Sequence, residues 1–535
     1  MDGACGAGCS GAGRGRFLGM ARAAWRGAVP ARVFGGAAAQ RASRALFAGH
    51  LECDCNRHGA GADAAAARDG GNDCRARSLN KRAGAAWVSD QPSGFLAKFV
   101  WTAGTFLVSA GLKFGLNIVL SYLLAPEILG VMVVVNAIRL GVELLTDMGI
   151  EQNIIHHADG LNPEFRDSAW TLQLLRGVLL SLVFAAASPL FADVYHIDVR
   201  IFLLVSLSPV IGGAHSTAIF VLVKHLEVQR RNGFELAAEA LAFAVQVALA
   251  LWLRSVWAPA IGLVAAVAIR TALSYLLPDA RQQLRFDGAI FGRIIDFGKW
   301  IALTSLVMYA ATNIDRLYLG KVAPLALLGV YGIARAIAEL PTTLARRMSY
   351  QIIFPALAGT AGEARAAGMA MMASSRMIFV IGTCLALAAA SAAADGLIAL
   401  IYDPRYLSAG WMLSVLLLGG IFAVLANLNE ALLLSVGRPA LSSAANLARL
   451  ATLAAAMPTG FALAGFGGAV AAVAATEALH YGYITIGLMF ARLAFWRQDA
   501  LALLGAAAVF IGVIALRMWF GLGDPFGGIG WKVTG

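Results

Sequence analysis

The side chains in this sequence best suited to binding chemistry are basic residues placed inside long apolar segments. They are Lys113, Arg139, Arg176, Arg316, Arg335 and Arg449. A cation at the middle of a membrane-spanning helix costs about 2.5–3.5 kcal/mol on insertion scales, so such residues usually face a water-filled path. Lys and Arg hold phosphate oxygens, Arg through a planar bidentate fork. Because the acids at similar depth are too few to pair with all of them, this set predicts a binding site for an anion.

Acidic residues accompany these cations at helical spacing. Glu143 follows Arg139 by four residues, and Glu339 follows Arg335 by four, which places each pair on one helix face. One interpretation is that they are local salt bridges, and that Arg176, near a segment end, extends to the membrane interface. The other is that acids in these segments bind a coupling proton or sodium ion. The candidates are Asp315, Glu143, Glu339 and Glu430.

Motifs for enzyme chemistry are absent from the sequence. No Gly-rich phosphate loop ends in Gly-Lys-Ser/Thr, and neither a Gly-x-Ser-x-Gly turn nor a His-Glu-x-x-His helix occurs. Four soft ligands near the amino terminus have spacing that fits no zinc pattern; they are Cys53, Cys55, His58 and Cys74. We therefore expect a protein that is not an enzyme and needs no cofactor or metal.

The elements that must position the charged residues are membrane-spanning helices. Hydrophobic residues make up 59% of the chain and charged residues 14%, against about 25% charged in soluble domains. Continuous apolar runs of about 20 residues recur from Phe95 onward, unlike the alternating pattern of transmembrane strands. The sequence thus predicts an all-α polytopic membrane protein with spans at residues 96–124, 127–149, 169–190, 201–223, 235–254, 257–277, 297–321, 325–354, 374–394, 410–435, 440–463, 466–490 and 500–520.

These spans form two sets of six and one extra. Residues 95–277 make a first six-helix lobe, 278–296 a cytoplasmic inter-lobe loop, and 297–495 a second six-helix lobe. Residues 496–535 carry the extra segment, which either spans the membrane or lies along its interface. Residues 1–94 have the composition of a disordered basic leader, because they contain too little apolar surface to fold. They are either a cytoplasmic tail or the product of a start codon assigned too early.

Loop charge predicts the orientation. Much of the net charge of +11 lies in the leader and in short loops, so it sets topology and does not indicate nucleic-acid binding. With the amino terminus in the cytoplasm, basic residues concentrate on the cytoplasmic side, as the positive-inside rule requires. They include Arg230, Arg231, Arg346, Arg347 and Arg376, whereas the opposite loops hold only Arg200, Arg254, Lys321 and Arg405.

The two lobes resemble each other in sequence. "LAPEILGVMVVVNAI" (residues 124–138) joins the first two spans, and "VAPLALLGVYGIARAI" (322–337) joins the seventh and eighth, so that Gly130 corresponds to Gly329. Each lobe has an even number of spans, so both enter the membrane from the same side. The repeat is then parallel, with a pseudo-twofold axis along the membrane normal and a central cavity suited to alternating access.

Several soft motifs in this order resemble a known family over roughly residues 95–495. They are "LAPEILG" (124–130), "TDMGIEQNIIHH" (146–157), "FRDSAWTLQLLRG" (165–177), "NIDRLYLGKVAPLALLGVYGIARAI" (313–337) and "IIFPAL" (352–357). The chain resembles the polysaccharide transporters, or lipid-linked oligosaccharide flippases, of the multidrug/oligosaccharidyl-lipid/polysaccharide (MOP) exporter superfamily. The resemblance implies twelve core helices, movement of undecaprenyl-pyrophosphate-linked sugar across the bacterial inner membrane, and a cationic cavity for the pyrophosphate.

Three other functions compete with this expectation. Within the same superfamily, a drug/cation antiporter predicts a cavity dominated by acids, and a peptidoglycan lipid-precursor flippase has fourteen spans by resemblance. From a different class, a membrane-embedded polysaccharide polymerase predicts a large outer loop, and the outer loops here are short. The expected partners of a flippase are its lipid-linked oligosaccharide, membrane lipids and polysaccharide polymerase or export proteins. We expect the chain to act as a monomer.

Overall fold

A computed structural model describes residues 92–526, apart from residues 147, 226, 350–361, 436, 491, 492, 494 and 522. Within this part of the chain every regular element is a helix. Seven of the described helices are long and apolar enough to cross a membrane, or up to nine if each of two bent helix pairs counts as one span. The prediction of an all-α polytopic membrane protein is therefore confirmed. The expected leader up to residue 91, Asp147 and the "IIFPAL" motif lie outside the described residues.

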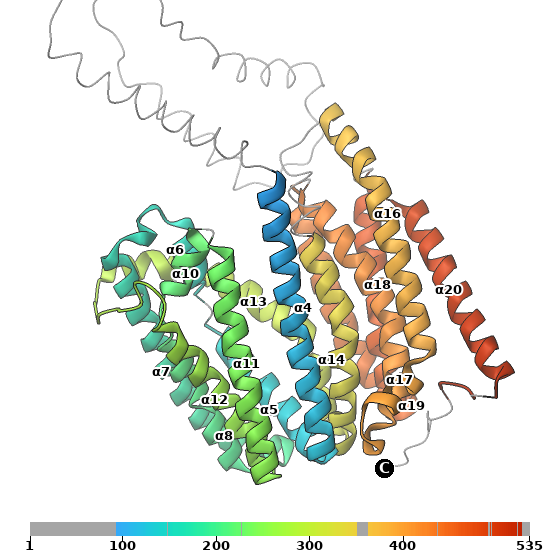
Figure 1. Cartoon of the computed structure of the whole chain (residues 1–535), viewed down its shortest axis with the longest axis horizontal. Coiled ribbons are helices and arrows are strands. Elements are labelled where there is room, and N and C mark those ends of the chain that lie inside the picture. The colour runs from blue at the N-terminus through green and yellow to red at the C-terminus, as the bar shows by residue number, and fades with distance from the viewer. Residues whose placement is uncertain are drawn as a thin grey trace, which may run out of the picture. The chain divides into compact units, whose positions relative to one another are not determined.

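The amino half of the described chain is a helical bundle in which long helices correspond to five of the first six expected spans (Figure 1). The long helices are α4 (Pro92–Leu123), α5 (Pro126–Leu144), α7 (Pro163–Tyr195), α11 (Val228–Leu253) and α12 (Trp257–Ser274). The fourth expected span is a series of three short helices, α8 (Val199–Val205), α9 (Ser208–Gly213) and α10 (Ala218–Lys224). Two short elements, α6 (Ile150–His156) and η2 (Ala158–Leu161), connect α5 to α7.

Local chemistry interrupts two of the expected spans. The span expected at 201–223 bends by 53° between α9 and α10. A separate break precedes α9, where Pro209 stands in the first turn and its missing N–H and fixed φ favour a new helix start. The span expected at 127–149 ends early, because α5 stops at Leu144. Gly149 then adopts a φ of 55°, a left-handed conformation that glycine tolerates without steric cost, and α6 begins at the next residue.

The carboxyl half contains the remaining long helices. They are α13 (Gly288–Val322), α14 (Leu325–Met348), α16 (Gly362–Ala392), α18 (Ala409–Ser435), α19 (Pro439–Phe490) and α20 (Trp496–Trp519), with the short α17 (Ala394–Ile401) and η4 (Pro404–Tyr406) between α16 and α18. Helix α18 is buried along most of its length and forms the core of this half. The 52 residues of α19 are two helices that meet at Ala464 and Gly465, where Gly465 has a φ of 59°. The two spans expected at 440–463 and 466–490 are thus joined directly.

The two halves meet where α5 and α14 begin. A Cβ atom added at Gly130 would lie 1.8 Å from the Leu325 carbonyl oxygen, and one added at Gly329 would lie 2.0 Å from the Pro126 carbonyl oxygen. Pro126 and Leu325 each precede their glycine by four residues, so the contact is reciprocal, as expected at a twofold axis. The two sequence segments identified as a repeat therefore cross each other at this axis.

Polar contacts hold the same end of the bundle closed. The Tyr406 hydroxyl donates to the Leu124 carbonyl oxygen over 3.0 Å, and the Tyr122 hydroxyl donates to the Ile401 carbonyl oxygen over 3.2 Å. Arg405 donates from Nη2 to the Ser121 carbonyl oxygen over 3.2 Å. These contacts join the carboxyl end of α4 to the segment between α17 and α18. We call this region, with the Gly130–Gly329 crossing, the closed end.

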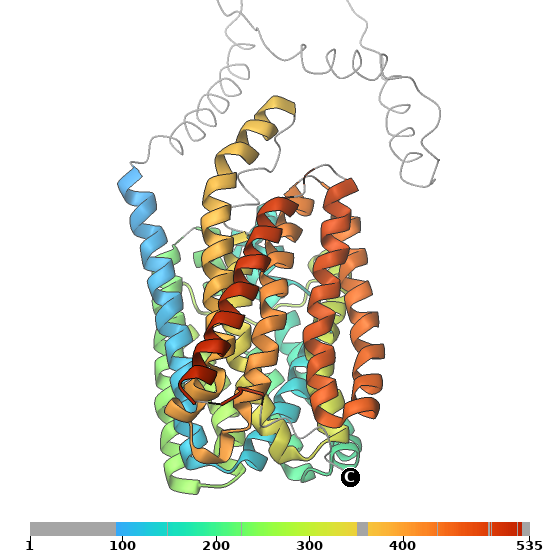
Figure 2. The same ribbon diagram turned by 90° about the vertical axis from the view of Figure 1, so that its right-hand side faces the viewer.

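Helix α20, the extra segment, runs parallel to α16 over its length (Figure 2). Near its start, the buried Asp499 carboxylate pairs with Arg376 of α16 over 2.7 Å. Near its end, Arg517 donates to the carbonyl oxygen of Ala392, the last residue of α16, over 2.8 Å, and pairs with Asp395 of α17 over 2.5 Å. Contacts at both ends place α20 alongside a long helix, which favours a span over an interfacial position. Arg376, expected in a cytoplasmic loop, instead lies within α16 with its side chain buried, and Asp499 balances its charge.

Candidate functional site

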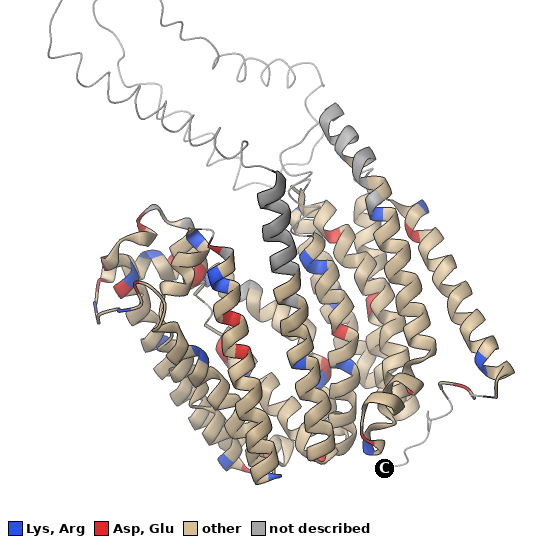
Figure 3. Cartoon of the chain, viewed as in Figure 1, with Lys and Arg blue, Asp and Glu red and all other residues tan. Residues whose placement is uncertain are grey.

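A cavity of about 660 Å³ lies between α4, α5, α11 and α12 of the amino half and α13 and α14 of the carboxyl half. Its charged lining consists of four cations and two carboxylates: Lys113, Arg139, Arg270, Arg316, Glu235 and Glu239. Figure 3 shows charged residues of both signs at mid-length of the bundle, where α4 passes α13 and α14. We call this space the amino-half cavity. Cations outnumber carboxylates among the residues that line it.

A second cavity, of about 570 Å³, adjoins the first and shares Arg139, Glu235 and Arg270 with it. Arg176 lines this adjoining cavity and is held in place by α5 and the residues after it. Its Nε donates to Thr146 Oγ1 over 2.9 Å, and its Nη2 donates to the Glu143 carbonyl oxygen. Arg176 thus faces the interior of the amino half, although its position near a segment end also suited an interfacial role.

Carboxylates from neighbouring helix turns and from other helices neutralise the cations of the amino half. Lys113 on α4 pairs with Glu239 on α11 over 2.8 Å, and Arg139 pairs with Glu143 over 2.5 Å. Arg270 on α12 pairs with Glu235 on α11 over 2.6 Å. The expectation that deep acids are too few to pair these cations is therefore wrong. Glu235 and Glu239 were overlooked because they stand at the start of an expected span, where charges normally reach the interface.

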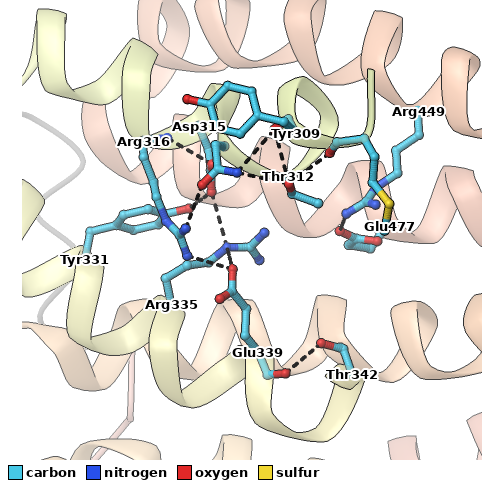
Figure 4. A network of polar contacts seen from close by, with 12 residues as sticks. Tyr309, Thr312, Asp315, Arg316, Tyr331, Arg335, Glu339, Thr342, Arg449 and Glu477 are labelled. Atoms are coloured by element: carbon cyan, nitrogen blue, oxygen red, sulfur yellow. Dashed lines mark hydrogen bonds and ion pairs between the residues drawn. The ribbon is translucent and has the colours of Figure 1, made fainter. Parts of the chain in front are cut away.

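A smaller cavity, of about 270 Å³, lies in the carboxyl half between α13, α14, α18 and α19. We call it the carboxyl-half cavity. Figure 4 shows its ion-pair network, which α13 and α14 supply. Arg335 Nε lies 3.2 Å from both Asp315 Oδ2 and Glu339 Oε1, and Arg316 Nη2 lies 2.8 Å from Glu339 Oε1. The Tyr331 hydroxyl donates to Asp315 over 2.6 Å, so this buried carboxylate has two separate side-chain partners.

The two parts of α19 contribute a further pair to the carboxyl-half cavity. Arg449 stands before the break at Gly465 and Glu477 after it, and the two side chains are hydrogen-bonded. His480, one turn after Glu477, also lines the cavity. Glu430 on α18 has neutral partners: Asn446 donates to it over 2.8 Å, and Ser442 also donates to it. Within the described residues no group of three His, Cys, Asp or Glu side chains could hold a metal ion.

The structure divides the six predicted cations between the two halves. Lys113 and Arg139 line the amino-half cavity and Arg176 the cavity beside it, whereas Arg335 and Arg449 line the carboxyl-half cavity. Arg316 lines both the amino-half and the carboxyl-half cavity. The six cations thus form two groups joined at Arg316. Spacing along single helices could not reveal this division, because it depends on which helices face each other.

Comparison with known families gives a match over residues 119–411 to a family model described as "Polysaccharide biosynthesis protein". Among curated proteins, the chain is 23% identical over 303 residues to the teichuronic acid biosynthesis protein TuaB of Bacillus subtilis (strain 168). The match covers 55% of this chain and 62% of that relative's length.

Two solved structures share the fold. An inward-facing conformation of a multidrug resistance MATE family transporter of the MOP superfamily superposes with a TM-score of 0.55 at 13% identity, covering 76% of this chain and 98% of the other. The lipid II flippase MurJ in an inward closed conformation gives a TM-score of 0.55 at 9% identity, covering 79% and 100%. These matches fit the two-lobe polytopic fold that the sequence predicts for this chain.

Proposed function

The chain belongs to the polysaccharide biosynthesis protein family, whose model covers more than half of it, and we propose that it is a flippase for a lipid-linked oligosaccharide. This membership and the shared fold confirm the resemblance to the polysaccharide transporters of the MOP superfamily. In the proposal, the substrate is an undecaprenyl-pyrophosphate-linked oligosaccharide of O-antigen, capsule or exopolysaccharide biosynthesis. The substrate moves across the bacterial inner membrane. The amino terminus of the transporter lies in the cytoplasm.

The observation that carries the proposal is the lining of the amino-half cavity. Four cations and two carboxylates share this cavity with sixteen apolar or glycine residues. A pyrophosphate needs cationic hydrogen-bond donors, and the polyprenyl chain attached to it needs apolar surface. One cavity supplies both, which supports a lipid pyrophosphate as cargo and disfavours a purely hydrophilic anion.

The ion pairs suggest how binding proceeds. Lys113 is bridged to Glu239 and keeps 67% of its side chain exposed, and Arg139 is bridged to Glu143. An incoming pyrophosphate binds N–H donors of Lys113 and Arg139 that their carboxylates leave free, so both the cations and the carboxylates keep a partner. The cost of desolvating a bare buried charge is thereby avoided. Rearrangement of the two halves that opens the closed end then presents the sugar on the other side.

Energy coupling requires a group whose charge can change during the cycle. Asp315, Glu143 and Glu339 each pair with an arginine, so a fixed cation already balances their charge. Glu430 is held by the neutral groups of Ser442 and Asn446. Glu430 is therefore the acid that we assign to coupling, with a proton or a sodium ion as the coupling species.

The residues that line the cavities separate the proposal from its rivals. A drug/cation antiporter needs a cavity in which carboxylates prevail, whereas cations prevail in the amino-half and carboxyl-half cavities. A peptidoglycan lipid-precursor flippase would use the same pyrophosphate chemistry. The similarity to a teichuronic acid biosynthesis protein favours a surface polysaccharide as the product. The sugar attached to the lipid therefore decides between these two flippases.

The first test is the sidedness of lipid-linked sugars in cells depleted of the protein, read with a membrane-impermeant probe. We expect polyprenyl-pyrophosphate oligosaccharide to accumulate on the cytoplasmic face, and its mass to identify the repeat unit. Intact cell-surface polysaccharide without such accumulation would refute the flippase assignment. Accumulation of a peptidoglycan precursor instead would identify that precursor as the substrate.

Complementation of these cells by variants tests the amino-half cavity. Lys113→Ala and Arg139→Ala should each reduce transport about tenfold or more, since each removes a charge-assisted phosphate contact, with membrane insertion unchanged. Lys321→Ala and Arg200→Ala are matched controls, because both side chains are exposed and line none of the three cavities. Equal transport by Lys113→Ala and Lys321→Ala would show that Lys113 does not bind the substrate.

A further inference from the structure

The carboxyl-half cavity differs in character from the amino-half cavity. Twelve of its twenty lining residues are polar or charged, against nine of twenty-five in the amino-half cavity. A wall of that polarity is poorly suited to a polyprenyl chain and well suited to a hydroxyl-rich group. The two cavities thus offer separate environments to the two ends of a lipid-linked sugar.

The charges of the carboxyl-half cavity do not balance. Its lining contains four arginines and two carboxylates: Arg316, Arg335, Arg346, Arg449, Glu339 and Glu477. Three of the arginines pair with acids. Arg346, in the last turn of α14, lines the cavity without a carboxylate partner within the part of the chain that the structure describes. A guanidinium that is partly shielded from water and unmatched favours an anionic ligand.

Neutral hydrogen-bonding groups surround these charges. They are Thr312, Asn313, Thr342, Thr343 and Asn427, from α13, α14 and α18. Hydroxyl and amide side chains both donate and accept hydrogen bonds, as sugar hydroxyls do. A simple inorganic anion would use only donors. The mixture of unmatched arginine with such neutral groups therefore indicates a ligand that carries hydroxyl groups together with a negative charge.

Size and position fit one sugar residue. The volume of about 270 Å³ corresponds to about nine water molecules in the liquid, which is the scale of a single pyranose ring with its substituents. Arg316 lines this cavity and the amino-half cavity alike. A sugar attached to a pyrophosphate at Arg139 and Arg316 can therefore reach the carboxyl-half cavity without leaving the protein interior.

Building on the proposed function, we propose that the carboxyl-half cavity is a subsite for an acidic sugar residue, whose carboxylate binds Arg346 and Arg449. The hydroxyl groups of the sugar bind the threonine and asparagine side chains of the wall. The flippase then selects oligosaccharides that bear a uronic acid or a similar carboxylate, in addition to recognising the pyrophosphate common to all its substrates.

The test uses the full chain in proteoliposomes and two probes, undecaprenyl-pyrophosphate disaccharides whose outer residue is glucuronic acid or glucose. The measured quantity is the ratio of the flipping rates of the acidic and the neutral probe. We expect wild type to favour the acidic probe, and Arg346→Gln to lower the ratio about tenfold, the effect of one charge-assisted hydrogen bond. Arg438→Gln is the matched control, because Arg438 is exposed and lines none of the three cavities.

The outcomes separate this inference from the function on which it rests. A ratio that is unchanged in Arg346→Gln, with both probes still transported, overturns the acidic-sugar subsite and leaves the flippase intact. Failure of wild type to move either probe refutes the flippase instead. Arg449→Gln strands the buried Glu477 and can impair folding, so the double variant Arg449→Gln/Glu477→Gln is the second test. It should lower the ratio as well.

Discussion

Glu430 illustrates how surroundings separate acids that look equivalent in the sequence. Asp315, Glu143 and Glu339 lie against arginines, whereas Glu430 accepts hydrogen bonds from Ser442 and Asn446. An arginine beside a carboxylate stabilises its charged form. Neutral partners leave room for a proton or sodium ion to bind and leave again.

The substitution Glu430→Gln should uncouple transport from the ion gradient. The amide keeps the shape and the hydrogen bonds but cannot change its charge, so gradient-driven transport should fall at least about tenfold while exchange without a gradient continues. Proteoliposomes with and without an imposed proton or sodium gradient provide the measurement. Glu127→Gln is the control, because Glu127 is exposed. Full gradient dependence in Glu430→Gln would exclude Glu430 as the coupling acid.

Sequence reasoning succeeded with partners on the same helix and failed with partners on other helices. The pairs Arg139–Glu143 and Arg335–Glu339 follow from a spacing of four residues, and both are present. Glu239 was not anticipated as the partner of Lys113, since no periodicity within a helix reports which helix lies opposite. The same limitation hid the division of the cations into two cavities.

At the scale of helices, the crossing of α5 and α14 depends on two small residues. A Cβ atom at Gly329 would meet backbone atoms of Pro126 at 2.0 Å, and backbone cannot give way as a flexible side chain does. Gly329→Ala should therefore destabilise the protein by about 1–3 kcal/mol, the usual cost of overpacking. The measurement is thermal unfolding in detergent.

Gly382→Ala provides the matched control for Gly329→Ala. Gly382 is also helical, and a Cβ atom there meets nothing within 4 Å, so alanine should leave stability unchanged or raise it through its higher helix propensity. Equal melting temperatures for the two variants would show that the α5–α14 crossing can open to admit a methyl group.

Element positions were largely predictable because hydrophobic length is a strong signal in membrane helices. The break inside α19 was also anticipated, since the expected spans ended at 463 and began again at 466, on either side of Gly465. The bend between α9 and α10 and the short α6 were not anticipated. Each depends on local backbone conformation within a segment whose hydrophobic composition predicts one unbroken helix.

At the scale of the whole described bundle, hydrogen bonds to backbone carbonyls close one end. Tyr122 and Tyr406 each donate one such bond between the two halves. The variant Tyr122→Phe/Tyr406→Phe loses about 2 kcal/mol if each bond contributes about 1 kcal/mol, which shifts the population of the open form roughly 30-fold.

The reporter for this shift is a cysteine at Leu124, which is 1% exposed in the closed end. In a background without the six native cysteines, Leu124→Cys should react faster with an impermeant maleimide when both tyrosines are phenylalanine. Tyr483→Phe is the control, since Tyr483 contacts only Thr452 on the surface of the carboxyl half among the described contacts. An unchanged labelling rate would mean that other contacts hold the end closed.

The pairing of cations with carboxylates also has an electrical consequence. Each elementary charge carried across a membrane potential of 100 mV changes the free energy by about 2.3 kcal/mol. In the empty transporter, Lys113, Arg139, Arg316, Arg335 and Arg449 already have carboxylate partners, so only the unmatched remainder senses the field when the two halves rearrange. The voltage dependence of the return step is thereby kept small. When a charged cargo is bound, it carries most of the charge on which the membrane potential acts.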